Sequence, residues 1–157
     1  MNTEEQQQLN KGYEYAMFLL NIKLRTEGEL NGKMKGKKYN EATIANVINQ
    51  LKENRYVDDK RFAEVYLENL KKYKSWGFYG IKKKLIEKRL PKEIIESVLS
   101  EGLSEEEELE IAKKFLKKQS QLSESSKTKT LNHQGFRAQT ARKLAAKGFR
   151  GSVVGKI

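Results

Sequence analysis

Residues 79–91 read YGIKKKLIEKRLP, and the same pattern occurs as GELNGKMKGKKYN at residues 28–40 and as AQTARKLAAKGFR at residues 138–150. Corresponding positions lie 51 and then 59 residues apart. The matched sets are Leu30, Lys33, Met34, Lys37 and Tyr39; Ile81, Lys84, Leu85, Lys88 and Leu90; and Thr140, Lys143, Leu144, Lys147 and Phe149. Spacing of this kind predicts an internal repeat, which has to be sought before any fold is assigned.

The register continues into the helices on either side of this pattern. Downstream, the first two copies share a matched apolar trio, and the third copy supplies only two members. These are Ile44, Val47 and Ile48; Ile95, Val98 and Leu99; and Val154 and Ile157. Upstream, each copy follows a longer amphipathic segment containing Ala16, Ala63 or Ala112. A chance match between Lys-bearing amphipathic helices would be less expected to extend this far, so the sequence predicts a three-helix unit repeated three times.

Helix starts are indicated by N-capping residues. Three pairs have the spacing of a capping box: Thr3 with Gln6, Thr26 with Glu29, and Ser104 with Glu107. Three further candidate N-caps are Asn40, Asp58 and Ser152, and Pro91 suits the first position of a helix. Together with apolar residues at helical spacing, these signals predict eight or nine short helices and no sheet.

Three units follow from this map, at residues 1–55, 56–101 and 102–157. Residues 120–132 are rich in Ser, Thr and Lys and have no apolar periodicity, so we expect a linker inside the third unit. The run GSVVGKI at residues 151–157 is short for a full last helix. We therefore expect an elongated, curved, right-handed all-α array whose third repeat is incomplete.

The composition is that of a basic helical protein. Hydrophobic residues make up 37% and charged residues 34%, which allows small cores but not a thick globular interior. The net charge of +11 favours a polyanion or an acidic protein as partner. Residues 120–157 carry eight Lys or Arg against one Glu, so the positive charge is concentrated late in the chain.

No residue constellation predicts catalysis, a cofactor site or a metal site. The chain has no Cys and only His133, so thiolate and histidine metal sites are excluded. Asp58 and Asp59 could be proposed as acid/base groups or Mg²⁺ ligands, but Asp before an apolar-periodic run is expected to cap a helix. The run Glu105–Glu108 complements the dipole of a helix whose later turns are lysine-rich. No apolar run is long enough to span a membrane, and the start lacks a secretory signal, so we expect a cytoplasmic protein.

The stretch from Tyr56 to Ala63, YVDDKRFA, together with Trp76-Gly77 and the basic segment to Leu90, resembles the RecX family of RecA regulators. The resemblance covers about residues 12–150 and includes Lys143-Leu144-xx-Lys147-Gly148-Phe149. The Asp-Asp-x-Arg-Phe-Ala element is its most specific part. The third copy departs from the pattern, because Thr140 stands where the others have Leu30 and Ile81.

The resemblance implies three tandem three-helix repeats that lie in the groove of the RecA–DNA filament and modulate RecA, usually by inhibition. It implies a non-enzymatic protein without a cofactor, active in DNA repair and recombination, and it gives Asp58, Asp59, Arg61 and Phe62 a structural role in holding a repeat together. We expect a monomer whose partners are the RecA filament and single-stranded or duplex DNA, bound without sequence preference. The candidate binding residues are Lys33, Lys37, Lys38, Lys82, Lys83, Lys84, Lys88, Arg89, Arg137, Arg142, Lys143, Lys147 and Arg150.

Two other readings remain open. A helical protein that binds DNA directly would use the same lysines through counterion release. A helical scaffold for an unrelated acidic protein would also carry this charge. The predominance of Lys over Arg favours contacts with a phosphate backbone or an acidic protein over base readout.

Overall fold

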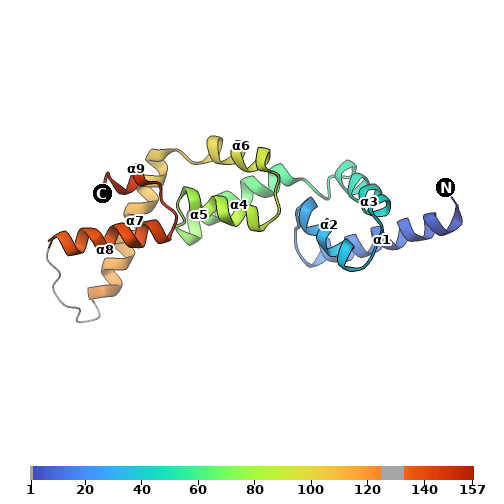
Figure 1. Ribbon diagram of the computed structural model, residues 1–157, viewed down its shortest axis with the longest axis horizontal. Coiled ribbons are helices and arrows are strands. Elements are labelled where there is room, and N and C mark those ends of the chain that lie inside the picture. Colours follow the sequence, from blue (N-terminus) through green and yellow to red (C-terminus); the bar gives the residue numbers. More distant parts are fainter. Residues whose placement is uncertain (1, 125–132) are drawn as a thin grey trace.

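The computed structural model of the chain describes residues 2–124 and 133–157, and these ranges contain helices and no strand. The helices follow one another along an elongated molecule, with the N-terminus at one end and α7 to α9 at the other (Figure 1). They are α1 (Thr3–Ile22), α2 (Glu27–Gly36), α3 (Glu41–Glu53), α4 (Asp59–Lys74), α5 (Phe78–Glu87), α6 (Lys92–Gly102), α7 (Glu105–Glu124), α8 (His133–Ala146) and α9 (Gly151–Val154).

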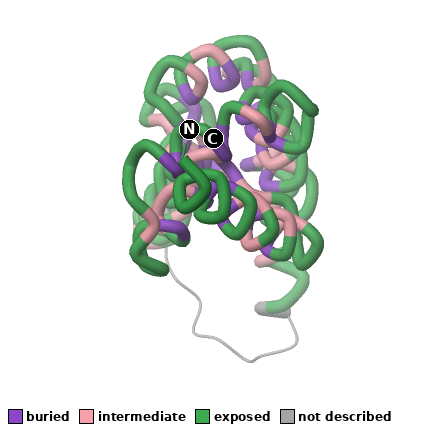
Figure 2. The backbone as a smooth tube through the Cα atoms, turned by 90° about the vertical axis from the view of Figure 1, so that its right-hand side faces the viewer, coloured by how far each residue is buried: buried purple, intermediate pink, exposed green. Residues whose placement is uncertain are grey.

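Each successive group of three helices encloses its own hydrophobic core. Buried residues lie on the inner sides of the helices, whereas the outer sides are exposed (Figure 2). The first core includes Leu30, Met34 and Leu51; the second includes Leu67, Ile81 and Leu85; the third includes Ala112, Leu144 and Val153. The predicted all-α fold of three tandem three-helix repeats is confirmed.

The same backbone turn closes the second helix of every repeat. Lys38, Arg89 and Gly148 have positive φ angles of 66°, 57° and 77°, and each follows a lysine of the sequence pattern. Two residues after that lysine, the N–H of Tyr39 or Phe149 returns to the carbonyl of Met34 or Leu144, at 3.2 and 3.1 Å. The 51- and 59-residue spacings therefore mark structurally equivalent positions.

Four of the helix starts expected from capping residues are confirmed. Thr26 and Glu29 form a capping box, and Asn40 and Asp58 accept the N–H groups of Thr43 and Arg61. Ser104 Oγ accepts the N–H of Glu107 at 3.1 Å. These side chains satisfy backbone donors that have no partner inside the helix.

Two expected caps are wrong. The capping box of α1 is formed by Asn2 and Glu5, one residue earlier than Thr3 and Gln6. Ser152 lies inside α9, whose N-cap is Arg150, and its hydroxyl donates to Glu105 at 3.0 Å. Pro91 also sits one position earlier than expected, at the N-cap of α6 rather than inside its first turn.

The third repeat is more tightly packed at its end than its sequence indicates. Phe149 and Val153 are buried, whereas Val154 is half-buried and Ile157 is 39% exposed. The core residue contributed by α9 is therefore Val153, one position before the expected Val154. Residues 120–124 of the expected linker belong to α7, and residues 125–132 lie outside the described residues.

The first and second repeats are joined at the start of α2. Thr26 donates its hydroxyl to the carbonyl of Lys88, which caps the end of α5, at 2.6 Å. The buried Asp59, first residue of α4, accepts the N–H of Glu27 at 2.8 Å. A Cβ at Gly28 would collide with the carbonyl oxygen of Arg89, so this joint requires a residue without a side chain. Asp59 therefore holds two repeats together, whereas the resemblance had implied a role within one.

The second and third repeats are joined at the start of α5 in the same way. The N–H of Gly77 donates to the carbonyl of Lys147 at 2.9 Å, and that of Tyr79 to the carbonyl of Gly148 at 2.8 Å. The fully buried Glu108 of α7 accepts the N–H of Phe78 at 3.0 Å. The same carboxylate forms an ion pair with the guanidinium of Arg150.

The two joints place α2, α5 and α8 head to tail along the molecule (Figure 1). In each joint, the N-terminus of one repeat's second helix meets the carbonyl end of the next repeat's second helix. A carboxylate from the first turn of α4 or α7 then accepts the first N–H of that helix. This arrangement satisfies orphan groups at both helix ends and aligns their opposite partial charges.

Asp59 provides a test of the first joint. Burial raises the pKa of its carboxyl above 3.8, against the lowering effect of the Glu27 amide. Asn keeps the acceptor oxygen without the buried charge, so Asp59→Asn should be at least as stable as the wild type at pH 7. Asp59→Ala should lose about 1 kcal/mol in the free energy of unfolding.

The contribution of Asp59 to the free energy of unfolding depends on pH in a direction that follows from its raised pKa. Because the folded-state pKa of Asp59 is raised, its contribution to stability is complete below pH 3.8 and is lost as the pH rises through the folded pKa. The difference between wild type and Asp59→Asn should therefore shrink on acidification, as measured by urea unfolding. Asp58→Ala, which removes a local helix cap, should cost about 1 kcal/mol in the free energy of unfolding. Equal stability of Asp59→Asn and Asp59→Ala at pH 7 would contradict this role for Asp59.

Glu108 provides a test of the second joint. Glu108→Ala leaves the guanidinium of Arg150 without its carboxylate and should lower the free energy of unfolding by about 3 kcal/mol. Trp76, the single tryptophan, lies at this joint and reports its unfolding by fluorescence. Glu106→Ala, at an exposed position two residues earlier, is the control and should change stability by less than about 0.5 kcal/mol. Identical denaturation midpoints for the two variants would show that the ion pair does not support the joint.

Candidate nucleic-acid and filament interface

Each repeat places a lysine over an aromatic ring of its own first helix. Nζ lies 5.6 Å from the ring centroid for Lys37 and Tyr15, 5.4 Å for Lys88 and Tyr66, and 5.6 Å for Lys147 and Phe115. These three lysines follow or cap the second helix, at equivalent positions of the repeat. We call them the lysine–aromatic pairs. The attraction between an ammonium group and a ring face fixes the direction of side chains that would otherwise be mobile.

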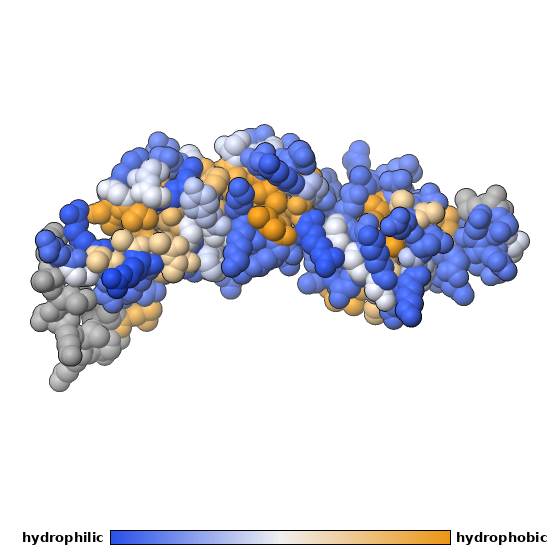
Figure 3. All heavy atoms as spheres, in the orientation of Figure 1, coloured by the Kyte–Doolittle hydropathy of each residue, from blue (hydrophilic) through white to orange (hydrophobic). Residues whose placement is uncertain are grey.

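The lysine–aromatic pairs recur along the array because the joints repeat. Lys37 is exposed, whereas Lys88 and Lys147 are half-buried. A cation next to a ring face can meet both a phosphate and a base, or a carboxylate and an apolar side chain. Hydrophilic residues cover much of the face shown in Figure 3, and hydrophobic surface is confined to patches between them.

Two lysines lie over the ring of Trp76 at the second joint, and we call Trp76, Lys84 and Lys147 the Trp76 cluster. Nζ of Lys147 lies 4.0 Å and Nζ of Lys84 lies 5.3 Å from its ring centroid. Lys147 also donates to the carbonyl of Lys74 at 3.0 Å. Burial lowers the pKa of Lys147, and the nearby charges of Lys74 and Lys84 lower it further. An anion bound here would relieve this repulsion.

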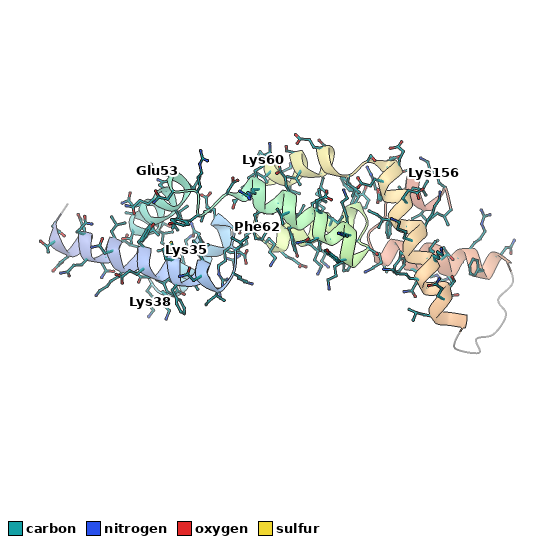
Figure 4. All side chains as sticks on the ribbon, turned by 180° about the vertical axis from the view of Figure 1, so that it is seen from behind. Lys35, Lys38, Glu53, Lys60, Phe62 and Lys156 are labelled. Carbon is teal, nitrogen blue, oxygen red and sulfur yellow. The ribbon has the colours of Figure 1, made fainter. Side chains whose placement is uncertain are left out.

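The other candidate binding residues fall into two groups. Among the pattern lysines, Lys33 and Lys143 are exposed, and Lys84 is partly neutralised by Glu87 at 3.4 Å. The remaining candidates are exposed except for Lys82 and Arg150, which are half-buried; the exposed ones are Lys38, Lys83, Arg89, Arg137 and Arg142. Seen from behind, Lys35 and Lys38 project near α1 and α2, and Lys60 and Phe62 lie at the start of α4 (Figure 4).

Arg150 and the Asp-Asp-x-Arg-Phe element have structural partners. Arg150 pairs with Glu108, and its guanidinium carbon lies 4.5 Å from the ring centroid of Phe78. Phe62 packs against the second core, 5.8 Å from the ring of Tyr66. Arg61 is exposed, and its backbone N–H is the one that Asp58 caps.

Sequence reasoning named Thr26 and Asp59 but not their part in joining the repeats, and it missed Glu108 and Lys71 as joining residues. Glu108 lies in an acidic run that was interpreted through the helix dipole alone, yet it is fully buried. Lys71, which was not singled out, has an 8% exposed side chain and binds Glu107 at 2.6 Å and the carbonyl of Gly102 at 2.7 Å. The 51-residue spacing between Thr26 and Gly77 was an available signal for the joints, because both residues contact the end of the second helix in the next repeat.

Residues 2–124 and 133–157 contain no group of three or more His, Cys, Asp and Glu side chains placed to hold a metal ion. None of the helices described in these ranges has the length and apolar character needed to cross a membrane.

The sequence of this chain is similar to that of known proteins. A family model described as the first three-helix domain of RecX matches residues 13–51, and one described as the second matches residues 58–99. A regulatory protein RecX from Oceanobacillus iheyensis is 29% identical over 154 residues, which are 98% of this chain and 54% of the relative. A regulatory protein RecX from Geobacillus sp. is 31% identical over 150 residues, which are 96% of this chain and 53% of the relative. The chain thus spans about half the length of these two curated relatives.

The fold also matches solved structures. The crystal structure of RecX from Lactobacillus salivarius superposes with a TM-score of 0.84, covering 96% of this chain and 94% of that one, at 23% sequence identity. A second crystal structure of a regulatory protein RecX gives a TM-score of 0.80. Two matched domain models, the curated relatives and the shared fold show that this chain belongs to the RecX family.

Proposed function

We propose that this protein regulates the RecA recombinase by binding the RecA–DNA filament through its basic helical faces, most simply as an inhibitor. The curated relatives are named regulatory proteins, and the RecX resemblance makes RecA the expected target. On this proposal the protein acts by occupancy in the cytoplasm, as a monomer without a cofactor. DNA would be contacted within the filament without sequence preference.

The observation that carries the proposal is the recurrence of the lysine–aromatic pairs in all three repeats. A filament presents equivalent groups at regular intervals along its axis. An elongated array with one equivalent basic site per repeat can therefore contact several successive positions of such a partner (Figure 1). Each contact can be weak, since linked sites reinforce one another when their geometry allows simultaneous binding.

A second candidate function is direct binding to DNA, independent of RecA. The positive charge around Trp76 supports this alternative, because a tryptophan ring among lysines resembles the stacking and charge arrangement of single-strand binding surfaces. Direct DNA binding that does not involve RecA would inhibit unrelated single-strand-dependent enzymes as strongly as it inhibits RecA.

The regulation of RecA is tested by DNA-dependent ATP hydrolysis of RecA titrated with this protein. The wild type should change the rate at concentrations below that of RecA. Lys84→Glu/Lys88→Glu should require at least about tenfold more protein, because it reverses two charges that belong to the Trp76 cluster and the second lysine–aromatic pair.

Two controls separate binding from folding. Lys11→Glu/Lys23→Glu has the same net charge change at exposed positions of the first repeat and should behave like the wild type. Lys84→Ala/Lys88→Ala should show a smaller loss with an unchanged melting temperature. Full activity of the charge-reversed variant at physiological salt would remove the basic face from the proposal. No effect of the wild type on RecA would overturn the proposal itself.

A further inference from the structure

A groove lies between α4 and α7, where the second repeat meets the third. Its volume is about 550 Å³. Five lysines contribute to its lining, two from α4 and three from α7: Lys71, Lys72, Lys114, Lys117 and Lys118. Lys117 and Lys118 follow Lys114 by three and four residues, so both lie next to Lys114 on one face of α7. None of the five is among the candidate binding residues expected from the sequence.

The three acidic residues of this groove are all paired with lysines. Glu68 and Glu107 share one partner, lying 3.0 and 2.6 Å from Nζ of Lys71, whose side chain is 8% exposed. Glu110 pairs with Lys113, outside the groove, at 3.3 Å. Five lysines and three glutamates line the groove, so its lining keeps a net charge of +2.

Four lysines remain without a carboxylate partner within the described ranges: Lys72, Lys114, Lys117 and Lys118. They line the two walls of the groove, one on α4 and three on α7. Residues one helical turn apart are separated by about 5.4 Å along the axis, so α7 offers its charges at two successive turns, with Lys114 on one and Lys117 and Lys118 on the next. A row of ammonium groups between two helices suits an extended anion.

An exposed aromatic ring adjoins this row. Tyr73 follows Lys72 in α4, its ring is 67% exposed, and Nζ of Lys72 lies 5.3 Å from the ring centroid. Exposed tyrosines beside a cationic groove form stacking platforms for nucleic-acid bases. An acidic peptide could use this ring only where an apolar side chain stands beside its carboxylate, whereas every nucleotide carries a phosphate and a base together, so this arrangement favours a nucleic acid.

We propose that the α4–α7 groove binds the phosphodiester backbone of a nucleic-acid strand through Lys72, Lys114, Lys117 and Lys118, with a base stacked on Tyr73. The inference rests on the proposed function only in requiring DNA to be present in the complex. Its site is separate from the lysine–aromatic pairs. In a RecA–DNA complex the groove would hold the strand while those pairs contact the filament.

The test uses DNA alone, without RecA, so its outcome is independent of filament regulation. The probe is a fluorescein-labelled oligothymidylate, and its affinity is measured by anisotropy over a range of KCl concentrations. Replacing all four lysines by Ala should reduce the slope of log affinity against log salt by about 3, since each phosphate contact contributes about 0.7 on a single strand. Tyr73→Ala should weaken binding about fivefold or more, and Tyr73→Phe should restore it.

The matched control removes four exposed lysines elsewhere: Lys11, Lys23, Lys35 and Lys60. This variant has the same net charge as the groove variant and should keep most of the wild-type salt slope. Equal loss of slope in both variants would reduce the effect to net charge and overturn the proposal. So would a groove variant that keeps oligothymidylate binding but loses binding to poly-L-glutamate, because the groove would then serve an acidic protein.

Discussion

The structure depends on one interaction that is made twice. The N-terminus of the second helix in one repeat lies against the carbonyl end of the second helix in the next repeat, and a carboxylate of that next repeat accepts its first N–H. Asp59 does this for α2, and Glu108 does it for α5. A helix N-terminus carries unpaired donors and partial positive charge, so a buried joint at that place needs an acceptor of this kind. The three repeats, each with its own small core, are thereby fixed relative to one another.

The functional surface follows from these joints. Because the second helices lie head to tail, the lysine that closes each one returns at an equivalent place, and an aromatic residue of the first helix holds it there. The Trp76 cluster and the α4–α7 groove both lie at the second joint, where Lys147 and Lys71 are also anchored. Loosening that joint would therefore change binding as well as stability.

Local signals in the sequence were sufficient for the repeats and most helix starts, whereas the joints required the structure. Asn40 and Asp58 cap donors three residues away, so the printed sequence contains both partners. Asp59 and Glu108 accept backbone N–H groups that lie 32 and 30 residues away. Almost every residue has such an N–H group, so the sequence does not indicate which one a distant carboxylate binds. The basic groove was missed because its lysines come from two repeats and interrupt no pattern in either.

Amide hydrogen exchange measured by NMR tests the joints most directly. The N–H groups of Glu27 and Phe78 occupy the first positions of α2 and α5, where helix amides ordinarily have no partner and exchange rapidly. With Asp59 and Glu108 as acceptors, both should be protected nearly as well as the core amides of Leu30 and Leu85. The N–H of Glu41, at the first position of the exposed start of α3, should exchange freely. Exchange of Glu27 and Phe78 as fast as that of Glu41 would show that the repeats are not joined in this way.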